Sequence, residues 1–153
     1  MVNIDSKNLS ITNQTKGKLT SLPFVNVVKK IKKDILGGDY ILSIAFVDKT
    51  TSHTINKKYR KKDRPTNVLS FALSKTSGEL LLCPAVIREE VKMKKFDKNF
   101  SELVGFLVIH GMLHLKGMQH GGTMEEAEET YYAKYFHRNR YRLRNNTSSS
   151  GRI

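Results

Sequence analysis

The sequence predicts an α+β fold, in which a small, mostly four-stranded mixed sheet packs with about five helices. Two observations predict it. Short segments rich in β-branched and apolar residues alternate with longer segments whose apolar residues recur at helical spacing. The length, 153 residues, suits one domain with one hydrophobic core. We expect that domain to span residues 1–144, and the polar tail at residues 145–153 to be disordered.

The first strand and the first helix are predicted in residues 9–38. Residues 9–13 alternate apolar and polar side chains, as a half-buried strand does. Pro23 suits the first turn of a helix, which Gly37 and Gly38 would end. Apolar residues recur at helical spacing in this segment, and four lysines take the opposite, solvated face. These lysines are Lys29, Lys30, Lys32 and Lys33.

The middle of the chain is predicted to hold three more strands and two short helices. Residues 40–47 are rich in β-branched and aromatic residues and are predicted as a buried strand, and residues 51–59 as a short helix. Two strands follow at residues 66–73 and 80–82, separated by a turn at Ser77 and Gly78. Pro84 is expected to open a charged helix that ends near Lys95.

Two helices complete the predicted fold. One begins near Asn99, with Glu102 three residues later as in a capping box. Its core-facing stripe consists of Leu103, Phe106, Leu107, His110, Leu113 and His114. The last helix is expected to open with a second capping box at residues 123–126. Four glutamates near its start are explained by favourable interaction with the helix dipole. They are Glu125, Glu126, Glu128 and Glu129.

Three of the five histidines lie within eleven residues. His110 and His114 are four residues apart, so on a helix their side chains project from the same face. Gly117 suits the end of that helix, and the turn there brings His120 back toward the other two. Three converging neutral imidazoles leave a fourth position for water and describe an open zinc site. We therefore predict one Zn²⁺ per chain on this central helix and the following turn.

The remaining histidines and the cysteine are given other roles. His53 and His137 are isolated and are expected to be ordinary surface histidines. Cys83 is the single cysteine, which excludes an internal disulfide framework and makes a reducing cytoplasm the expected location. We expect Cys83 to be a buried structural thiol, with a fourth zinc ligand as the alternative. The N-terminus lacks the apolar stretch of a signal peptide, and the longest apolar run, residues 103–109, is too short to span a bilayer.

The histidine spacing also matches the long motif of zinc proteases, except at one position. Gly111 stands where those enzymes carry the glutamate that acts as general base. Because the protease mechanism needs that carboxylate, the pattern favours a zinc hydrolase of another kind.

The chain is strongly basic, with 27 Lys and Arg against 14 Asp and Glu and a net charge of +13. This excess favours a polyanionic partner, either nucleic acid or an anionic membrane surface, over the alternative of a generally basic proteome. Residues 57–64 place six cations in eight positions around one aromatic residue, Tyr59. This basic run is the part of the chain most suited to contact phosphates.

The basic run leads into a predicted strand, and residues 56–71 read N-K-K-Y-R-K-K-D-R-P-T-N-V-L-S-F. Residues 110–120 read H-G-M-L-H-L-K-G-M-Q-H. Together these segments resemble the YbeY family of bacterial endoribonucleases, whose pattern runs approximately N-x-x-[YF]-R-x-x-[DN]-x-P-T-D-V-L-S-F and then H-G-x-L-H-L-x-G-x-D-H. The resemblance covers about residues 40–120. It implies zinc bound by the three histidines, an essential catalytic Arg60, and cleavage of single-stranded RNA in maturing the 3′ end of small-subunit rRNA and in ribosome quality control.

Two positions depart from that pattern, since Asn67 and Gln119 stand where the family usually has Asp. Neither side chain ionises, which leaves the general base and the choice between a hydrolytic and a 2′-hydroxyl route open. The planar guanidinium of Arg60 suits the charge on a scissile phosphate. Tyr59 or Phe71 can stack an unpaired base, although a core role is expected for Phe71. The lysines predicted to hold the RNA backbone are Lys57, Lys58, Lys61 and Lys62.

The function expected from these observations is that of a zinc-dependent, single-strand-specific endoribonuclease of the cytoplasm. Its expected partners are single-stranded rRNA and small-subunit ribosomal components, with neither a membrane nor an organic cofactor. One alternative is a non-catalytic, zinc-containing assembly factor that binds rRNA, which the two lost carboxylates favour. Another is a zinc hydrolase of a different substrate such as a peptide, which Gly111 and the basic charge disfavour.

Overall fold

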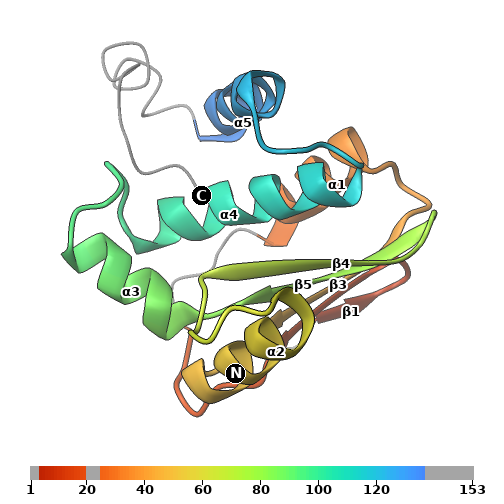
Figure 1. Ribbon diagram of the computed structural model, residues 1–153. Helices are drawn as coiled ribbons and strands as arrows, with labels where there is room; N and C mark the ends of the chain where they lie inside the picture. Colours follow the sequence, from red (N-terminus) through yellow and green to blue (C-terminus); the bar gives the residue numbers. More distant parts are fainter. Residues whose placement is uncertain (1–3, 20–24, 137–153) are drawn as a thin grey trace.

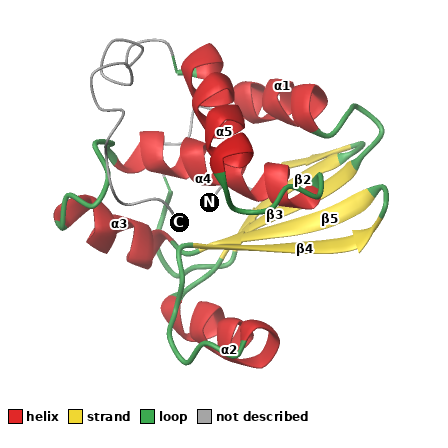
Figure 2. Ribbon diagram, turned by 45° about the horizontal axis from the view of Figure 1, so that its top comes forward, coloured by secondary structure: helices red, strands yellow, loops and turns green. Residues whose placement is uncertain are grey.

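The computed structural model describes residues 4–19 and 25–136, and these residues form one mixed sheet and five helices (Figure 1). The helices are α1 (Val25–Ile35), α2 (Lys49–Arg60), α3 (Pro84–Lys92), α4 (Phe100–Leu115) and α5 (Gly122–Tyr135). α1 and α4 cover one face of the sheet, α5 lies over α4, and α2 lies on the opposite side (Figures 1 and 2). The predicted α+β class is confirmed.

The sheet has five strands in the order β1-β2-β3-β5-β4 within the described residues. They are β1 (Ile4–Ser6), β2 (Leu9–Asn13), β3 (Ile41–Phe46), β4 (Val68–Ser74) and β5 (Ser77–Leu82). The three central strands are parallel, and β1 and β4 pair antiparallel at the two edges. β1 is an edge strand that the sequence did not predict, because three residues are too few to show a period.

The turn between β4 and β5 lies at Lys75 and Thr76, so the turn predicted at Ser77 and Gly78 is wrong. Both of those residues belong to β5. A Cβ at Gly78 would overlap the hydroxyl of Tyr40. The glycine therefore permits close packing in a strand, a role that a sequence reading cannot tell from a turn.

Helix α4 forms the centre of the hydrophobic core. The predicted capping box is confirmed, since the Asn99 side chain accepts from the Glu102 amide at 2.8 Å and the Glu102 carboxylate accepts from the Asn99 amide at 3.0 Å. Every residue from Glu102 to Leu113 is buried. The helix packs against β4, β5, α1, α3 and α5, so it is buried on all sides rather than along one stripe.

Helix α1 differs from its prediction in one lysine. Lys29, Lys30 and Lys33 are exposed, but Lys32 is 5% exposed, and its placement on the solvated face is wrong. Its Nζ donates to the carbonyl oxygens of Gly37 and Gly38 at 3.2 and 3.0 Å, and burial lowers its pKa. The long side chain thus reaches back to the turn after the helix. The predicted start of this helix at Pro23 lies outside the described residues.

Helix α5 begins at Gly122, and no side-chain cap bonds its N-terminus, so the capping box predicted at residues 123–126 is wrong. Gly121, with φ of 152°, precedes the helix and lets the chain turn before Thr123 is reached. The tail predicted to be disordered lies outside the described residues. Within the described part of the chain, no helix has both the length and the apolar composition needed to cross a membrane.

Candidate metal centre

Helix α4 and the turn that follows it bring the three predicted histidines together. His110 and His114 lie one helical turn apart, and Gly117, with φ of +103°, reverses the chain so that His120 faces them. One ring nitrogen from each lies within 4.8 Å of those of the other two. His110 is buried, His114 is half-buried and His120 is exposed, so the cluster opens to solvent on one side. This cluster can hold a metal ion.

Hydrogen bonds determine which nitrogens of His110 and His114 face the centre. His114 Nδ1 lies 3.0 Å from the carbonyl oxygen of Met118, which only accepts, so this nitrogen carries the hydrogen. His110 Nδ1 lies 3.2 Å from Oε2 of Glu128, a carboxylate that also accepts. In the neutral rings, both Nε2 atoms therefore present lone pairs toward the centre.

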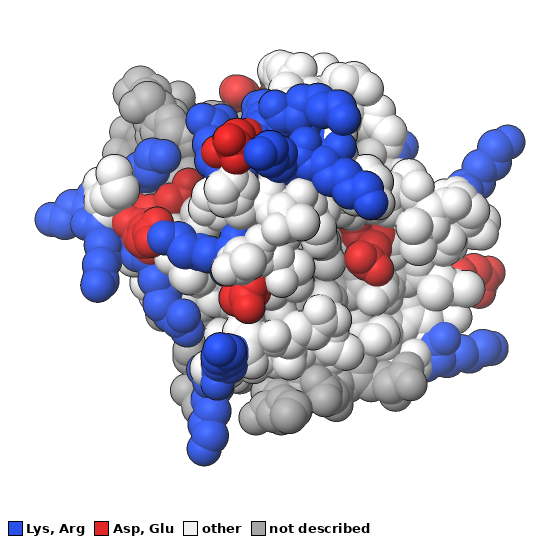
Figure 3. Space-filling model, turned by 60° about the horizontal axis from the view of Figure 1, so that its bottom comes forward, with Lys and Arg blue, Asp and Glu red and all other residues white. Residues whose placement is uncertain are grey.

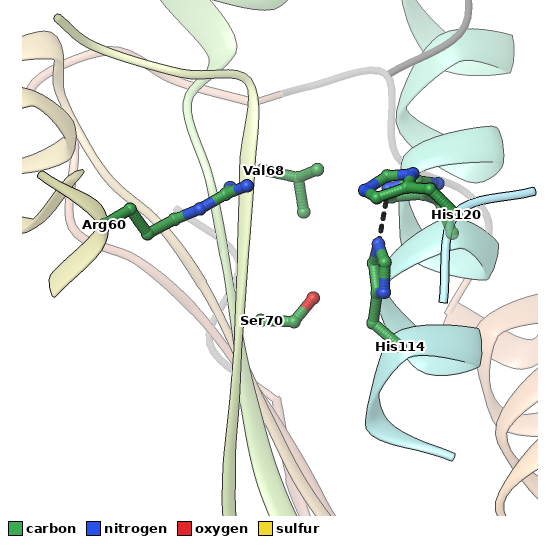
Figure 4. A pocket seen from close by; sticks show the side chains of 6 residues that line it. Arg60, Val68, Ser70, His114 and His120 are labelled. Atoms are coloured by element: carbon green, nitrogen blue, oxygen red, sulfur yellow. Dashed lines mark hydrogen bonds between the residues drawn. The ribbon is translucent and has the colours of Figure 1, made fainter. Parts of the chain in front are cut away.

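The two Nε2 atoms lie 3.1 Å apart (dashed line in Figure 4). Two lone pairs at this distance repel each other. Protonation of His114 would remove the repulsion, but it is disfavoured because burial, and to a smaller extent the neighbouring His110, lowers the pKa of this ring. A cation between them removes the repulsion. Tetrahedral zinc with Zn–N distances of about 2.0–2.1 Å places its ligand nitrogens about 3.3–3.4 Å apart, so the donor set fits zinc.

A cavity of about 280 Å³ joins the histidines to Arg60, Val68 and Ser70. Arg60, the last residue of α2, extends toward the cavity from the side opposite His114 and His120, with the β4 residues Val68 and Ser70 between them (Figure 4). No ion pair between Arg60 and a carboxylate is found in the described residues. Asp63, three residues further along the chain, contacts His53 Nε2 at 2.6 Å. The guanidinium therefore remains available to a ligand.

Gly111 faces the sheet and not the cavity. A Cβ at this position would lie 2.6 Å from Cδ2 of Leu80 and 3.2 Å from Oγ of Ser70. Ser70 Oγ also donates to the Gly111 carbonyl at 3.4 Å. A protease-type glutamate does not fit here without displacing the sheet, which agrees with the absence of that residue from the motif.

Neither position that departs from the family pattern lines this cavity. Gln119 is exposed, whereas Asn67 is 4% exposed and donates from Nδ2 to Oε1 of Glu90 at 2.9 Å. Asn67 lines a second cavity, of about 530 Å³, which adjoins the first and shares Arg60 and His120 with it.

The four predicted RNA-binding lysines are all exposed but do not face one place. Lys62 lines the second cavity beside the metal centre. Lys57 and Lys58 line a separate hollow with His53 and Asp63. Lys61 follows the end of α2 with φ of 59°, and its Nζ donates to the Lys58 carbonyl at 3.2 Å. On the face shown in Figure 3, Lys and Arg side chains likewise stand at several places around the rim.

The histidine cavity is not lined by Tyr59, Phe71 or Cys83. Tyr59 is 60% exposed and meets Phe71 edge to face, with ring centroids 5.6 Å apart. Phe71 packs against a small buried cluster, in agreement with a core role. Cys83 is buried, which raises the pKa of its thiol, and it does not belong to the histidine cluster. His137 lies outside the described residues.

Sequence reasoning missed Glu128. It was grouped with three other glutamates as a helix-dipole residue, yet it is 4% exposed and contacts His110. A signal for it exists in the sequence, because Met124, Glu128 and Tyr132 recur every four residues and are the buried residues of α5. An acid in the middle of an apolar stripe indicates a buried partner.

Comparisons with known proteins agree with the two motifs. The family profile described as Endoribonuclease YbeY matches residues 3–137. A relative from Cupriavidus metallidurans named Endoribonuclease YbeY is 35% identical over 116 residues, which is 72% of this chain and 58% of the relative. One of the same name from Lactobacillus helveticus is 38% identical over 121 residues, covering 67% of this chain and 66% of the relative. The match thus spans less than two thirds of the length of each of these relatives.

A solved structure shares the fold. The solution structure of protein TM1509 from Thermotoga maritima superimposes with a TM-score of 0.61 and 25% sequence identity, covering 94% of this chain and 99% of that one. With the three histidines converging at the C-terminal end of α4 and the family profile matching the whole described region, this chain belongs to the YbeY family.

Proposed function

We propose that this protein is a zinc-dependent, single-strand-specific endoribonuclease of the cytoplasm. It acts in rRNA maturation at the 3′ end of small-subunit rRNA and in ribosome quality control, with ribosomal components as partners and with neither a membrane nor an organic cofactor. The observation that carries the proposal is the cavity flanked on one side by the three histidines and on the other by Arg60. Such an arrangement suits a phosphodiester, because a cation held by the histidines and the guanidinium of Arg60 would both attract its charged oxygens.

In this mechanism, the histidines hold one Zn²⁺, which when bound lowers the pKa of a coordinated water and polarises a phosphoryl oxygen. Arg60 binds the scissile phosphate and offsets the charge that develops on it. Lys62 holds the backbone beside the cavity. Tyr59, exposed next to Arg60, stacks an unpaired base, which favours single strands over duplexes.

A second candidate function is a zinc-containing assembly factor that binds rRNA without cutting it. One observation favours it: among the described residues that line the histidine cavity, none is a carboxylate. The chain itself thus offers no acidic general base at this place. The same observation does not distinguish between attack by the RNA's own 2′-hydroxyl and attack by water, so the proposed endoribonuclease function includes both routes.

The test compares RNA cleavage and RNA binding in the same preparations. Zinc-loaded wild type, chelator-stripped wild type and His114→Ala are incubated with single-stranded RNA from the 3′ end of small-subunit rRNA and with a matched duplex. We expect cleavage of the single strand by the zinc-loaded protein alone, with RNA binding retained in His114→Ala. Binding without cleavage by the zinc-loaded protein would support the assembly factor instead.

A further inference from the structure

The second cavity, of about 530 Å³, has a proposed role only through Lys62, Arg60 and His120 at its lining, and its remaining residues have none. The second cavity shares Arg60 and His120 with the histidine cavity. An RNA strand whose scissile phosphate lies between Arg60 and the histidines can therefore continue into the second cavity. Its volume falls within the range of about 300–1,000 Å³ that small-molecule sites occupy. The cavity is thus placed and sized for the nucleotide next to the scissile phosphate.

The charges that line this cavity decide which part of the nucleotide lies where. Lys62 and Arg64 attract phosphates. Glu90 lines the same cavity with a side chain that is only 15% exposed, and its carboxylate repels a phosphate. The base and not the backbone therefore faces Glu90. Met93, which is 70% exposed, and Phe96 offer apolar surface to the flat face of that base.

Asn67 holds Glu90 in one orientation. Its Nδ2 donates to Glu90 Oε1 at 2.9 Å, while Lys95 Nζ lies 3.8 Å from Oε2. The Oδ1 atom of Asn67 is buried and has no hydrogen-bond partner among the described residues. Because that atom is buried, Glu90 is the member of the Asn67–Glu90 pair that can accept from a ligand in the cavity. An aspartate at position 67 would not donate to Glu90, so the pairing depends on the asparagine of this chain.

We propose that this cavity is a base subsite that prefers a nucleobase with an exocyclic amino group, cytosine above all, to uracil. Carboxylates accept from the amino group of cytosine, whereas uracil presents a carbonyl oxygen at the same place. The subsite rests on the proposed endoribonuclease function, since it places the base beside the bond that is cut.

The test measures binding apart from cleavage. Wild type, Glu90→Gln and the control Glu126→Gln, an exposed glutamate on α5, are stripped of metal with a chelator so that they do not cut RNA. Each is then titrated with short single-stranded RNAs in which one cytosine at a time is replaced by uracil. In wild type and in the control, we expect the exchange at one position to weaken binding roughly tenfold. In Glu90→Gln, an amide N–H replaces one acceptor, so the preference should disappear or reverse.

Two other outcomes overturn the proposal. If wild type binds every RNA equally, the cavity does not discriminate bases. If the preference persists unchanged in Glu90→Gln, discrimination arises elsewhere. Loss of RNA binding in all three proteins would instead overturn the proposed function.

A separate observation concerns Glu128, which contacts the metal cluster without belonging to it. We infer that Glu128 is a positioning residue for His110. Both side chains are 4–5% exposed, and the carboxylate accepts from Nδ1 of the ring, which leaves Nε2 to face the centre of the histidine cluster, where a metal would be held. A carboxylate behind a histidine ligand fixes its tautomer and orientation and makes it a stronger ligand.

Metal affinity tests this role. Glu128→Met keeps the volume of the side chain but removes the acceptor, and Glu128→Gln keeps an acceptor oxygen. We measure zinc affinity by competition with a chelator and expect it to be about 10- to 100-fold weaker in Glu128→Met than in wild type. In Glu128→Gln we expect an affinity close to that of wild type. Glu126→Gln serves as the control. A lower melting temperature of the metal-free Met variant with unchanged zinc affinity would show a structural role only.

Discussion

At the scale of single residues, the metal centre is organised by hydrogen bonds that hold the outer nitrogens of two histidines. His110 is oriented by Glu128 from α5, and His114 by the Met118 carbonyl from the turn after its own helix. The third, His120, is exposed. Two of the three proposed ligands are therefore oriented in the metal-free protein, which would reduce the entropy lost on metal binding.

The pH dependence of zinc binding follows from these histidines. A proton competes with the metal for Nε2, so affinity can only fall as the pH falls. Burial lowers the pKa of His114 from its ordinary value near 6.5, which keeps this ring neutral into mildly acidic solution. We expect zinc affinity, measured by chelator competition between pH 5 and 8, to be nearly constant above about pH 7 and to decline below about 6.5. A rise in affinity toward acid pH would exclude histidine ligation.

Arg60 is expected to act on turnover. Arg60→Lys retains the charge but loses the planar fork, so we expect most RNA cleavage to be lost while zinc content and melting temperature stay near wild type. The loss should lie mainly in kcat, because only interactions that strengthen in the transition state accelerate the reaction. Arg88→Lys, at an exposed arginine of α3 that lines neither cavity, is the matched control. Full activity in Arg60→Lys would show that Arg60 contributes only its positive charge.

At the scale of elements, α4 carries His110 and His114 and also forms the centre of the core. Its position against the sheet depends on Gly111, where a Cβ would lie 2.6 Å from Leu80. We expect Gly111→Ala to lower the free energy of unfolding by about 1–3 kcal/mol in denaturant titrations, because overpacking at this contact moves the helix. Gly122→Ala, with no atom near the added Cβ, should be neutral or slightly stabilising. Equal effects of the two substitutions would show that helix propensity and not packing is responsible.

Helices α1 and α5 are joined by Asp34, which accepts from Lys134 Nζ and from the Tyr135 hydroxyl, both at 2.6 Å. The lysine and then the tyrosine lower the pKa of Asp34. A carboxylate with a lowered pKa contributes stability above its unfolded pKa, about 3.9, and loses it as the pH falls through the folded pKa. We expect Asp34→Asn to melt a few degrees below wild type at pH 7, with a difference that shrinks below about pH 4. A difference that is independent of pH would assign the effect to packing.

At the scale of the whole molecule, the net charge of +13 is spread over several places. Within the basic run, Lys62 lines the second cavity beside the histidines, whereas Lys57 and Lys58 line another hollow. The basic run therefore does not act as one patch in the folded chain.

RNA binding should show this distribution through its dependence on salt. Each phosphate contact to a single strand contributes about −0.7 to the slope of log affinity against log salt. We expect a variant with Ala at positions 57, 58, 61 and 62 to have a flatter slope than wild type, measured by fluorescence anisotropy between 50 and 300 mM salt. The slope should flatten less in the double variant Lys57→Ala/Lys58→Ala than in Lys62→Ala alone. An unchanged slope in the quadruple variant would mean that these lysines form only a solvated face.

The sequence by itself determined the features that depend on local spacing. The histidine cluster follows from a four-residue interval and a glycine turn, and the Asn99 cap and the principal strands follow from patterns a few residues long. Errors arose where one residue type serves two local purposes. Gly78 was assigned to a turn although it permits close packing in β5, and Lys32 was assigned to solvent although it reaches back to its own helix end.

Only the tertiary structure decided which distant segments meet. Arg60 lines one cavity with the histidines because α2 ends beside β4. Glu128 contacts His110 because α5 lies over α4, and Asn67 pairs with Glu90 of α3. Each of these arrangements joins residues 18 or more positions apart, and no periodicity in one segment specifies its distance from another. They depend on how the helices pack against the sheet, which is a property of the whole core.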